Sequence, residues 1–344
     1  MIARARSTKN ASAHAEAFSS GGATEVARQL ATIEREGGDG TLRFAARRTL
    51  HVSSLEKPFF PDDGFSKGDV MRYYASVAGA LLPAIKDRPL VLKRYPDGIS
   101  GPSFFQQNAG NHTASGVRTA TVETEAGDAA ERIIGGDLLT LLYTVQIGTI
   151  AVHAWQARLR TLKYADTTTI DLDPGDHVPF RTVVDLANAI KAELDEFDLV
   201  AGVKTSGSRG IHIVLPLPAR TPFELASRVA QSIAERVARH NPKLATVERS
   251  IRSRPRGTIY VDAQQNSAGK SVVAAYSVRE RTGAPVSAPL EWTELRRTLR
   301  LDTFTVKTMP GRLRKVGDLW GAAMSRRNSK RALERVVHDT SDGR

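Results

Sequence analysis

Apolar residues recur along this chain at two spacings, one of which predicts helices and the other strands. Apolar positions three to four residues apart are typical of a helix with one buried face, whereas short apolar runs between turn residues are typical of strands. The predicted helices cover residues 23–36, 67–82, 137–148, 182–197, 222–240 and 313–344. The predicted strands cover residues 89–95, 117–125, 149–153, 167–172, 199–204, 211–217, 258–262 and 271–276.

The order of these elements favours a mixed α/β (α+β) fold. Strands and helices interleave without the strict alternation that a doubly wound parallel sheet requires. Composition divides the chain into a flexible tail over residues 1–40 that contains the first helix, a main domain over 41–312, and a basic helical tail over 313–344. Ser66 and Asp69 have the spacing of a capping box, which predicts where the helix of the main domain begins.

The charge balance narrows the class of partner. The chain has 49 Lys plus Arg against 37 Asp plus Glu, a formal net charge of +12, which favours a polyanion such as nucleic acid over a merely solubilising basic surface. No apolar run approaches the ~18 residues that a membrane-spanning helix needs, and no apolar leader opens the chain, so no membrane partner is expected. The absence of cysteine excludes disulfides and cysteine-ligated metal sites, and a reducing cytoplasm is the expected compartment.

Three aspartates are the strongest candidates for chemistry. Asp171 and Asp173 are two residues apart in a predicted strand, so their side chains project from one face of it. Neighbouring carboxylates repel each other unless a cation lies between them, and their hard oxygen atoms suit Mg²⁺ or Mn²⁺. Asp262 ends a second apolar strand and could complete a two-metal site. Each acid taken alone is also explained by turn chemistry or by a strand end that faces solvent.

The polar loop over residues 205–210 joins two apolar strands and forms a second candidate site. Its glycines let backbone N–H groups approach a ligand closely, while Ser206 and Arg209 add a hydroxyl group and a forked cation. His212 follows in an otherwise apolar strand. A cradle for a triphosphate fits these residues, and a flexible hairpin loop with a packed histidine is the alternative.

Other residues are weaker candidates when each is taken alone. Lys93 and His153 stand at the ends of predicted strands, where a solvated cation and a packed histidine are common. Phe104 and Phe105 lie in a predicted polar loop, where paired aromatic side chains either stack on bases or anchor the loop in the core.

Four stretches of the chain together resemble a known family. They are residues 65–70 with the helix that follows, residues 171–176 (Asp-Leu-Asp-Pro-Gly-Asp), residues 206–212 (Ser-Gly-Ser-Arg-Gly-Ile-His), and Asp262 followed by residues 274–279 (Ala-Ala-Tyr-Ser-Val-Arg). In this order they resemble the archaeo-eukaryotic primase (AEP) superfamily, and most closely the polymerase module of the bacterial end-joining ligase LigD. The similarity runs from about residue 54 to residue 295. It implies a primase-like core of mixed β-sheets flanked by helices, and a DNA-dependent primase-polymerase activity.

The resemblance also implies a role for each matched residue. Asp171, Asp173 and Asp262 would be catalytic and would bind two Mn²⁺ or Mg²⁺ ions. The residues expected to bind the incoming nucleotide are Lys93, His153, Ser206, Arg209, His212, Gln265 and Arg279. Among these, His153 and Gln265 would lie near the sugar, where the family favours ribonucleotides. The residues expected to bind DNA are Lys57 and Lys67, on a 5′-phosphate, and Phe104 and Phe105, on the template.

The chain departs from the family pattern at a few positions. Arg209 stands where the family usually has lysine, which keeps the charge but changes its geometry. Gln107 also replaces a usual lysine, and the position of the basic residue before Asp262 is altered. There is no ligase-type Lys-x-Asp-Gly motif and no nuclease module, so a polymerase without its own ligase is expected.

The expected role is gap filling or end joining in DNA repair, in the cytoplasm at the nucleoid. The expected partners are DNA with gaps or 5′-phosphate ends, NTPs or dNTPs, and Ku or a separate ligase. Three other functions stay open: a catalytically weak module that bridges DNA ends, another metal-dependent phosphotransferase or nuclease that uses the same acids, and a basic structural protein of the nucleoid. The ordered acids argue against the first and the third, and dependence on NTPs would separate the second.

Overall fold

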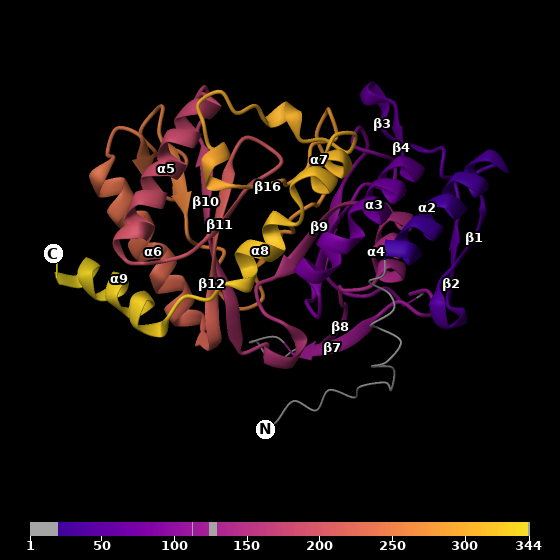
Figure 1. Ribbon diagram of the computed structural model, residues 1–344, viewed down its shortest axis with the longest axis horizontal. Coiled ribbons are helices and arrows are strands. Elements are labelled where there is room, and N and C mark those ends of the chain that lie inside the picture. Colours follow the sequence, from indigo (N-terminus) through magenta and orange to yellow (C-terminus); the bar gives the residue numbers. More distant parts are fainter. Residues whose placement is uncertain (1–19, 112, 124–128, 343–344) are drawn as a thin grey trace.

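The computed structural model describes residues 20–111, 113–123 and 129–342 of the chain. Within these residues the strands form one six-stranded and one four-stranded sheet, accompanied by three two-stranded sheets. Helices are interspersed among the strands along the chain without strict alternation, and they pack on the sheets (Figure 1). The mixed α/β fold expected from the order of the elements is therefore confirmed.

The six-stranded sheet carries the predicted acids. Its strands, in order across the sheet, are β13 (Ala245–Thr246), β14 (Ile259–Asp262), β10 (Tyr164–Pro174), β12 (Ile211–Pro222), β11 (Gly202–Thr205) and β16 (Pro289–Leu290). Neighbouring strands are antiparallel, except that β13 and β14 are parallel. In the central strands, side chains such as Ile170, Leu172 and Ile213 are fully buried. Their burial fixes which face of β10 remains free for polar residues.

The four-stranded sheet consists of β15 (Ser271–Val273), β9 (Thr149–Trp155), β5 (Leu90–Arg94) and β6 (Phe104–Gln106), all antiparallel to their neighbours. The expectation that Phe104 and Phe105 lie in a loop is wrong. Both belong to the edge strand β6, where Phe104 pairs with Arg94 and Phe105 with Lys93. Both rings stay exposed, so this three-residue strand shows none of the burial pattern that predicts a strand.

Helices cover both sheets (Figure 1). They are α2 (Ser20–Arg35), α3 (Lys67–Ile85), α4 (Leu138–Gln146), α5 (Phe180–Glu196), α6 (Phe223–His240), α7 (Met309–Val316), α8 (Leu319–Ser325) and α9 (Lys330–Asp342). α5 and α6 pack on the six-stranded sheet, α4 packs on β9, and α8 contacts both α3 and the strands β11 and β12. Among the described residues, none of the helices combines the length and the apolar character needed to cross a membrane.

The capping box predicted for α3 is present. The Ser66 side chain accepts the Asp69 N–H at 3.2 Å, and the Asp69 carboxylate accepts the Ser66 N–H at 2.8 Å. The helix buries Tyr73 and Tyr74 on one face, and the Tyr74 hydroxyl donates to the Ile150 carbonyl at 2.7 Å. α3 is thus fixed both at its first turn and against β9 of the four-stranded sheet.

Three two-stranded sheets lie outside the two main ones. They pair β1 (Gly40–Arg43) with β2 (Thr49–Val52), β3 (Pro58–Phe60) with β4 (Phe65–Ser66), and β7 (Thr119–Glu123) with β8 (Ala129–Ile133). Only β7 lies in a predicted strand. The others are two to five residues long, which is too short for a spacing pattern to appear.

The segments expected to be tails are in part packed on the main domain. Residues 1–19 lie outside the described residues, but α2 buries Leu30 and Ile33 and packs on α3. At the other end, α9 buries Leu333 and packs on α6. Residues 20–40 and the last helix therefore join the hydrophobic core, because each helix has an apolar face that water would otherwise contact.

Candidate active site

Strand register brings the three predicted acids together. Asp171 and Asp173 lie on one face of β10, while Leu172 between them turns into the core. Across the neighbouring strand, the Cα atom of Asp262 pairs with that of Asp171. On the opposite side, His212 of β12 pairs with the same residue. Asp171 therefore stands between Asp262 and His212 in the middle of the sheet.

The carboxylates affect one another electrostatically. Burial raises the pKa of Asp173, and the charges of Asp171 and Asp262 raise it further, against the opposing effect of Arg254. Burial by itself would also raise the pKa of Asp171, but His212, Lys204 and Arg279 together outweigh it, and the pKa is lowered. A bound cation would relieve the repulsion that the neighbouring carboxylates exert on Asp173.

The acids fit a divalent cation by chemistry and by backbone position. Carboxylate oxygens are the ligands that Mg²⁺ and Mn²⁺ prefer. Across the described ranges, however, no three or more His, Cys, Asp or Glu side chains are grouped so that they could hold a metal ion. The Asp171 carboxylate lies 3.3 Å from His212 Nε2, and the Asp262 carboxylate accepts the Gln264 N–H at 2.7 Å. The carboxylates are thus neighbours in the sheet, but each is engaged by a different protein group.

The loop between β11 and β12 is closed by its own serine. The Ser206 hydroxyl oxygen accepts two N–H groups of the loop, each at 3.1 Å. Arg279 donates from Nη1 to the Ser206 carbonyl at 2.6 Å, and a Cβ atom at Gly207, whose φ is +70°, would collide with the Arg279 side chain. The loop is therefore held in one shape against Arg279. Arg209 remains exposed and lies 3.7 Å from Asp176.

A buried lysine that the sequence analysis missed lies beside His212. Lys204 Nζ is 2.8 Å from His212 Nδ1 and 2.7 Å from Ser287 Oγ, and the residue is only 1% exposed. Burial lowers the pKa of Lys204 to about 7. The one available signal was a lone lysine at the end of an apolar predicted strand, which is rare in a buried strand unless the lysine is paired.

Glu280, also missed, holds two predicted cations together. Lys93 donates to one carboxylate oxygen at 2.7 Å, and Arg279 donates to the other at 3.2 Å. Burial would raise the pKa of Glu280, but the Arg279 charge and the Lys93 hydrogen bond lower it to about 2. Glu280 is therefore ionised at neutral pH and keeps Lys93 and Arg279 adjacent.

His153 lies beside the same cations. Its ring meets the Phe105 ring edge-on, with centroids 6.1 Å apart, and Lys93 Nζ lies 5.7 Å from the centroid of Phe105. Burial lowers the pKa of His153 to about 3, so its ring is neutral at neutral pH. His153 Nε2 is buried and has no hydrogen-bond partner among the described residues. A buried ring nitrogen in this state is suited to the hydroxyl group of a ligand.

Two further residues complete the surroundings of the acids. Gln265 Nε2 lies 3.4 Å from the Asp262 carboxylate. Arg254 lies 3.9 Å from the centroid of the Tyr260 ring and 3.7 Å from the Asp173 carboxylate. Arg254 is thus a basic residue before Asp262 in the chain that lies beside the acids.

The residues predicted to bind DNA fall in two places. At the start of α3, the Lys67 N–H donates to the Lys57 carbonyl at 2.8 Å, and the Lys57 ammonium pairs with Asp97 at 2.7 Å. Burial and then the Lys57 charge lower the pKa of Lys67. Phe104 and Phe105, which are 48% and 59% exposed, stand on the edge strand β6. The structure joins Phe105 to Lys93 and His153, whereas the two lysines form a group of their own.

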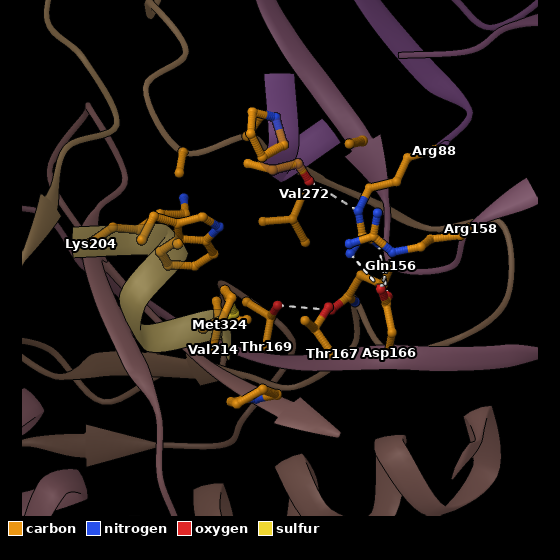
Figure 2. A pocket seen from close by; sticks show the side chains of 18 of the residues that line it. Arg88, Gln156, Arg158, Asp166, Thr167, Thr169, Lys204, Val214, Val272 and Met324 are labelled. Atoms are coloured by element: carbon orange, nitrogen blue, oxygen red, sulfur yellow. Dashed lines mark hydrogen bonds and ion pairs between the residues drawn. The ribbon is translucent and has the colours of Figure 1, made fainter. Parts of the chain in front are cut away.

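A cavity of about 240 Å³ borders the first part of β10, where Asp166, Thr167 and Thr169 line it (Figure 2). Thr169 and Lys204 line it, and at its far end Arg88 and Arg158 both donate to Asp166. None of the three catalytic candidates lines this cavity. Lys204 borders it and also contacts His212, so the cavity lies behind the candidate active site instead of forming it.

Comparison with known proteins adds independent findings. The model of a protein family described as the primase-polymerase domain of LigD matches residues 66–320. The multifunctional non-homologous end joining protein LigD of Pseudomonas aeruginosa is 33% identical over 276 residues, which are 78% of this chain and 32% of that protein. The bifunctional non-homologous end joining protein LigD of Bacillus subtilis is 32% identical over 269 residues, which are 78% of this chain and 43% of that protein.

One solved structure is also similar to this chain. It is the polymerase domain of Mycobacterium tuberculosis ligase D in complex with DNA, with a TM-score of 0.74 and 29% sequence identity. The similarity covers 80% of this chain and 98% of the solved domain. The chain thus spans only about a third of the P. aeruginosa protein and less than half of the B. subtilis protein, but nearly all of the solved polymerase domain. Its mixed sheets flanked by helices match the fold of that domain.

Proposed function

Because this chain belongs to the LigD primase-polymerase family, and is thus a nucleotidyltransferase of the polymerase type, we propose that it extends a primer along a DNA template. The observation that carries the proposal is the register that places Asp262 beside Asp171, with Asp173 on the same face of the sheet. Acids in this arrangement, next to a closed loop and a group of cations, suit the transfer of a nucleotide from its triphosphate.

Asp171, Asp173 and Asp262 would hold the divalent cations, Mn²⁺ or Mg²⁺. When bound, such ions supply positive charge that activates the attacking hydroxyl group and balances the charge of the departing pyrophosphate. The carboxylates of Asp171 and Asp262, which now contact protein donors, would then bind the cations instead. Burial raises the pKa of Asp173, and the nearby charges of Asp171 and Asp262 raise it further, so a cation between these carboxylates would favour the ionised form of Asp173.

The triphosphate would lie against the loop that Ser206 closes. His212 and Arg209 would contact it from the loop and from β12, and Arg279 and Lys93 from the other side. Glu280 supports this role because it keeps the two cations in place before the nucleotide arrives. Preorganised cations stabilise charge in a transition state without the cost of reorganising at that moment.

His153 and Gln265 would contact the sugar. The unpartnered, buried Nε2 of His153 supports a contact with a sugar hydroxyl, and with it a preference for ribonucleotides. Gln265 donates a hydrogen bond to the Asp262 carboxylate, which places its side chain next to the proposed metal ligands.

DNA would be bound on two surfaces. The exposed rings of Phe104 and Phe105 would stack on the template, and Lys57 and Lys67 would bind a 5′-phosphate at a gap or break. We further propose a role in gap filling or end joining, in the cytoplasm at the nucleoid and with Ku or a separate ligase as partner. The relatives, which are named for non-homologous end joining, support the end-joining part of this proposal.

The test is extension of a labelled primer across a short gap with a 5′-phosphate, with NTPs or dNTPs and Mn²⁺ or Mg²⁺. Asp171→Ala should lower the rate by about a hundredfold or more, because it removes one of the charges on which the reaction depends, while DNA binding persists. The matched control is Asp302→Ala, an exposed aspartate paired with Arg300, which should extend normally.

The possible results separate the candidate functions. Extension by the wild type that Asp171→Ala retains in full would contradict the assignment. DNA binding by the wild type without any extension would indicate a bridging module, and cleavage of DNA without nucleotide would indicate a nuclease. The ratio of ribonucleotide to deoxynucleotide use measures the proposed sugar preference.

A further inference from the structure

The side-chain nitrogen of Lys204 has two hydrogen-bond partners, Ser287 and His212. Lys204 lies on β11 with 1% of its surface exposed, and its Nζ is 2.7 Å from Ser287 Oγ and 2.8 Å from His212 Nδ1. The Ser287 hydroxyl donates its hydrogen to the Thr205 carbonyl at 2.8 Å. Ser287 Oγ must therefore accept from Lys204, and a further hydrogen on Nζ is available for His212.

The other ring nitrogen of His212 faces an acceptor. His212 Nε2 lies 3.3 Å from an oxygen of the Asp171 carboxylate. An ionised carboxylate only accepts hydrogen bonds, so the contact is favourable when Nε2 carries the ring hydrogen. A neutral imidazole has a single N–H group, which leaves Nδ1 to accept from Lys204.

From this chain of contacts we propose that Lys204 is a positioning residue that fixes His212 in the tautomer with its hydrogen on Nε2. The hydrogen then points at Asp171 and, on the basis of the function proposed above, at the triphosphate of the nucleotide. The opposite tautomer would turn a lone pair towards the carboxylate and the phosphates, which repel it. Lys204 thus decides whether His212 is a donor or an acceptor at the site.

The burial of Lys204 supports this role over a purely structural one. An amine costs free energy to bury unless it is hydrogen-bonded, and methionine would fill a similar volume at no such cost. We therefore attribute the presence of an amine at this buried position to the hydrogen bonds that it makes. Its two partners come from different segments, β12 and the chain that leads to β16, and only the His212 contact leads on to the acids.

The first test measures the tautomer of His212 in the wild-type protein, and a variant serves only to assign the signal. In protein labelled with ¹⁵N at histidine, long-range ¹H–¹⁵N spectra of the imidazole rings report which ring nitrogen carries the hydrogen, and His212→Gln assigns the signal by removing it. We expect His212 to be in the Nε2–H form in the wild type. A His212 signal in the Nδ1–H form would overturn the proposal.

The second test compares variants in the same spectra. Lys204→Met should allow the Nδ1–H form of His212 to appear, whereas the control Ser287→Ala, which leaves the contact between Lys204 and His212, should keep the Nε2–H form. Unchanged His212 signals in folded Lys204→Met would overturn the proposal. If that variant does not fold, a wild-type His212 signal in the Nδ1–H form would still overturn the proposal.

The third test connects the tautomer to nucleotide binding. Lys204→Met should raise the KM for NTP about tenfold, the effect of losing one hydrogen bond to a charged group, and change kcat less. In the His212→Ala background, Lys204→Met should change KM by less than about twofold, because Lys204 acts through His212. An equal change in KM on Lys204→Met in the wild-type and His212→Ala backgrounds would contradict a role of Lys204 through His212. A chain with the expected tautomer and no polymerase activity would refute only the proposed function.

Discussion

Glu280 is an acid that takes no part in the proposed reaction and yet determines the geometry of the site. Its carboxylate accepts hydrogen bonds from Lys93 and Arg279, two cations that would otherwise repel each other. It is nearly buried, so the cations have little water to screen them. A buried ion pair of this kind gives modest net stability when intact, but the loss of one partner leaves an uncompensated charge.

We therefore predict that Glu280→Gln lowers the free energy of unfolding at neutral pH by about 3 kcal/mol. The pKa of Glu280, about 2, lies below its ordinary value of 4.5. Its contribution is thus complete above the ordinary pKa and is lost as the pH falls towards the folded-state pKa. Urea unfolding of the wild type and the variant at neutral pH and at about pH 3 measures this.

The difference between wild type and Glu280→Gln should shrink at the lower pH. The exposed Glu36 provides a matched control, since Glu36→Gln should change stability little at either pH. A difference between wild type and Glu280→Gln that stays constant over this range would show that the carboxylate charge is not the source of the stability.

At the scale of elements, α9 extends the fold beyond the part that the family model matches. The match ends at residue 320, and α9 covers Lys330–Asp342. The helix packs on α6, and Arg236 of α6 forms an ion pair with Asp339. Leu333 is 0% exposed at this contact, which makes α9 a part of the hydrophobic core.

Leu333→Ala should destabilise the protein by about 3 kcal/mol, through lost burial and the cavity left behind. The expected measurement is a lower urea midpoint with an unchanged slope. Arg331→Ala on the exposed side of the same helix should shift stability by no more than about 0.5 kcal/mol. Equal stability of Leu333→Ala and wild type would mean that α9 frays from α6 in solution.

At the scale of the whole molecule, the net charge of +12 contributes to the affinity of the protein for a polyanionic partner. Basic residues attract a polyanion and, on binding, release its condensed counterions. The attraction depends on the summed charge of the whole molecule. Two of the arginines near the acids are already paired, Arg254 with Asp173 and Arg279 with Glu280.

Affinity for a short gapped DNA duplex should fall steeply with salt. If the protein neutralises about six phosphates, it falls roughly a thousandfold between 50 and 200 mM salt. Fluorescence anisotropy of labelled DNA measures this, and the slope of log affinity against log salt counts the phosphates contacted. A flat dependence would point to binding through stacking on Phe104 and Phe105, with little part for the charge.

The sequence by itself determined the local features. Spacing of apolar residues located α3, α5, α6 and the central strands, because a helix of several turns or a buried strand repeats its pattern often enough to be recognised. It also put Asp171 and Asp173 on one face, since alternation along a strand is a local property. The net charge of +12 indicated a polyanionic partner in the same way, from composition alone.

Only the tertiary structure decided which strands meet and in which register. Asp262 pairs with Asp171 although about ninety residues separate them, and Lys204, Glu280 and Ser287, which the motifs gave no role, join the site through their side-chain contacts. The edge strand β6 likewise exists through its pairing with β5. Register and side-chain contacts of this kind depend on how distant faces pack together, and a local spacing pattern carries no information about that.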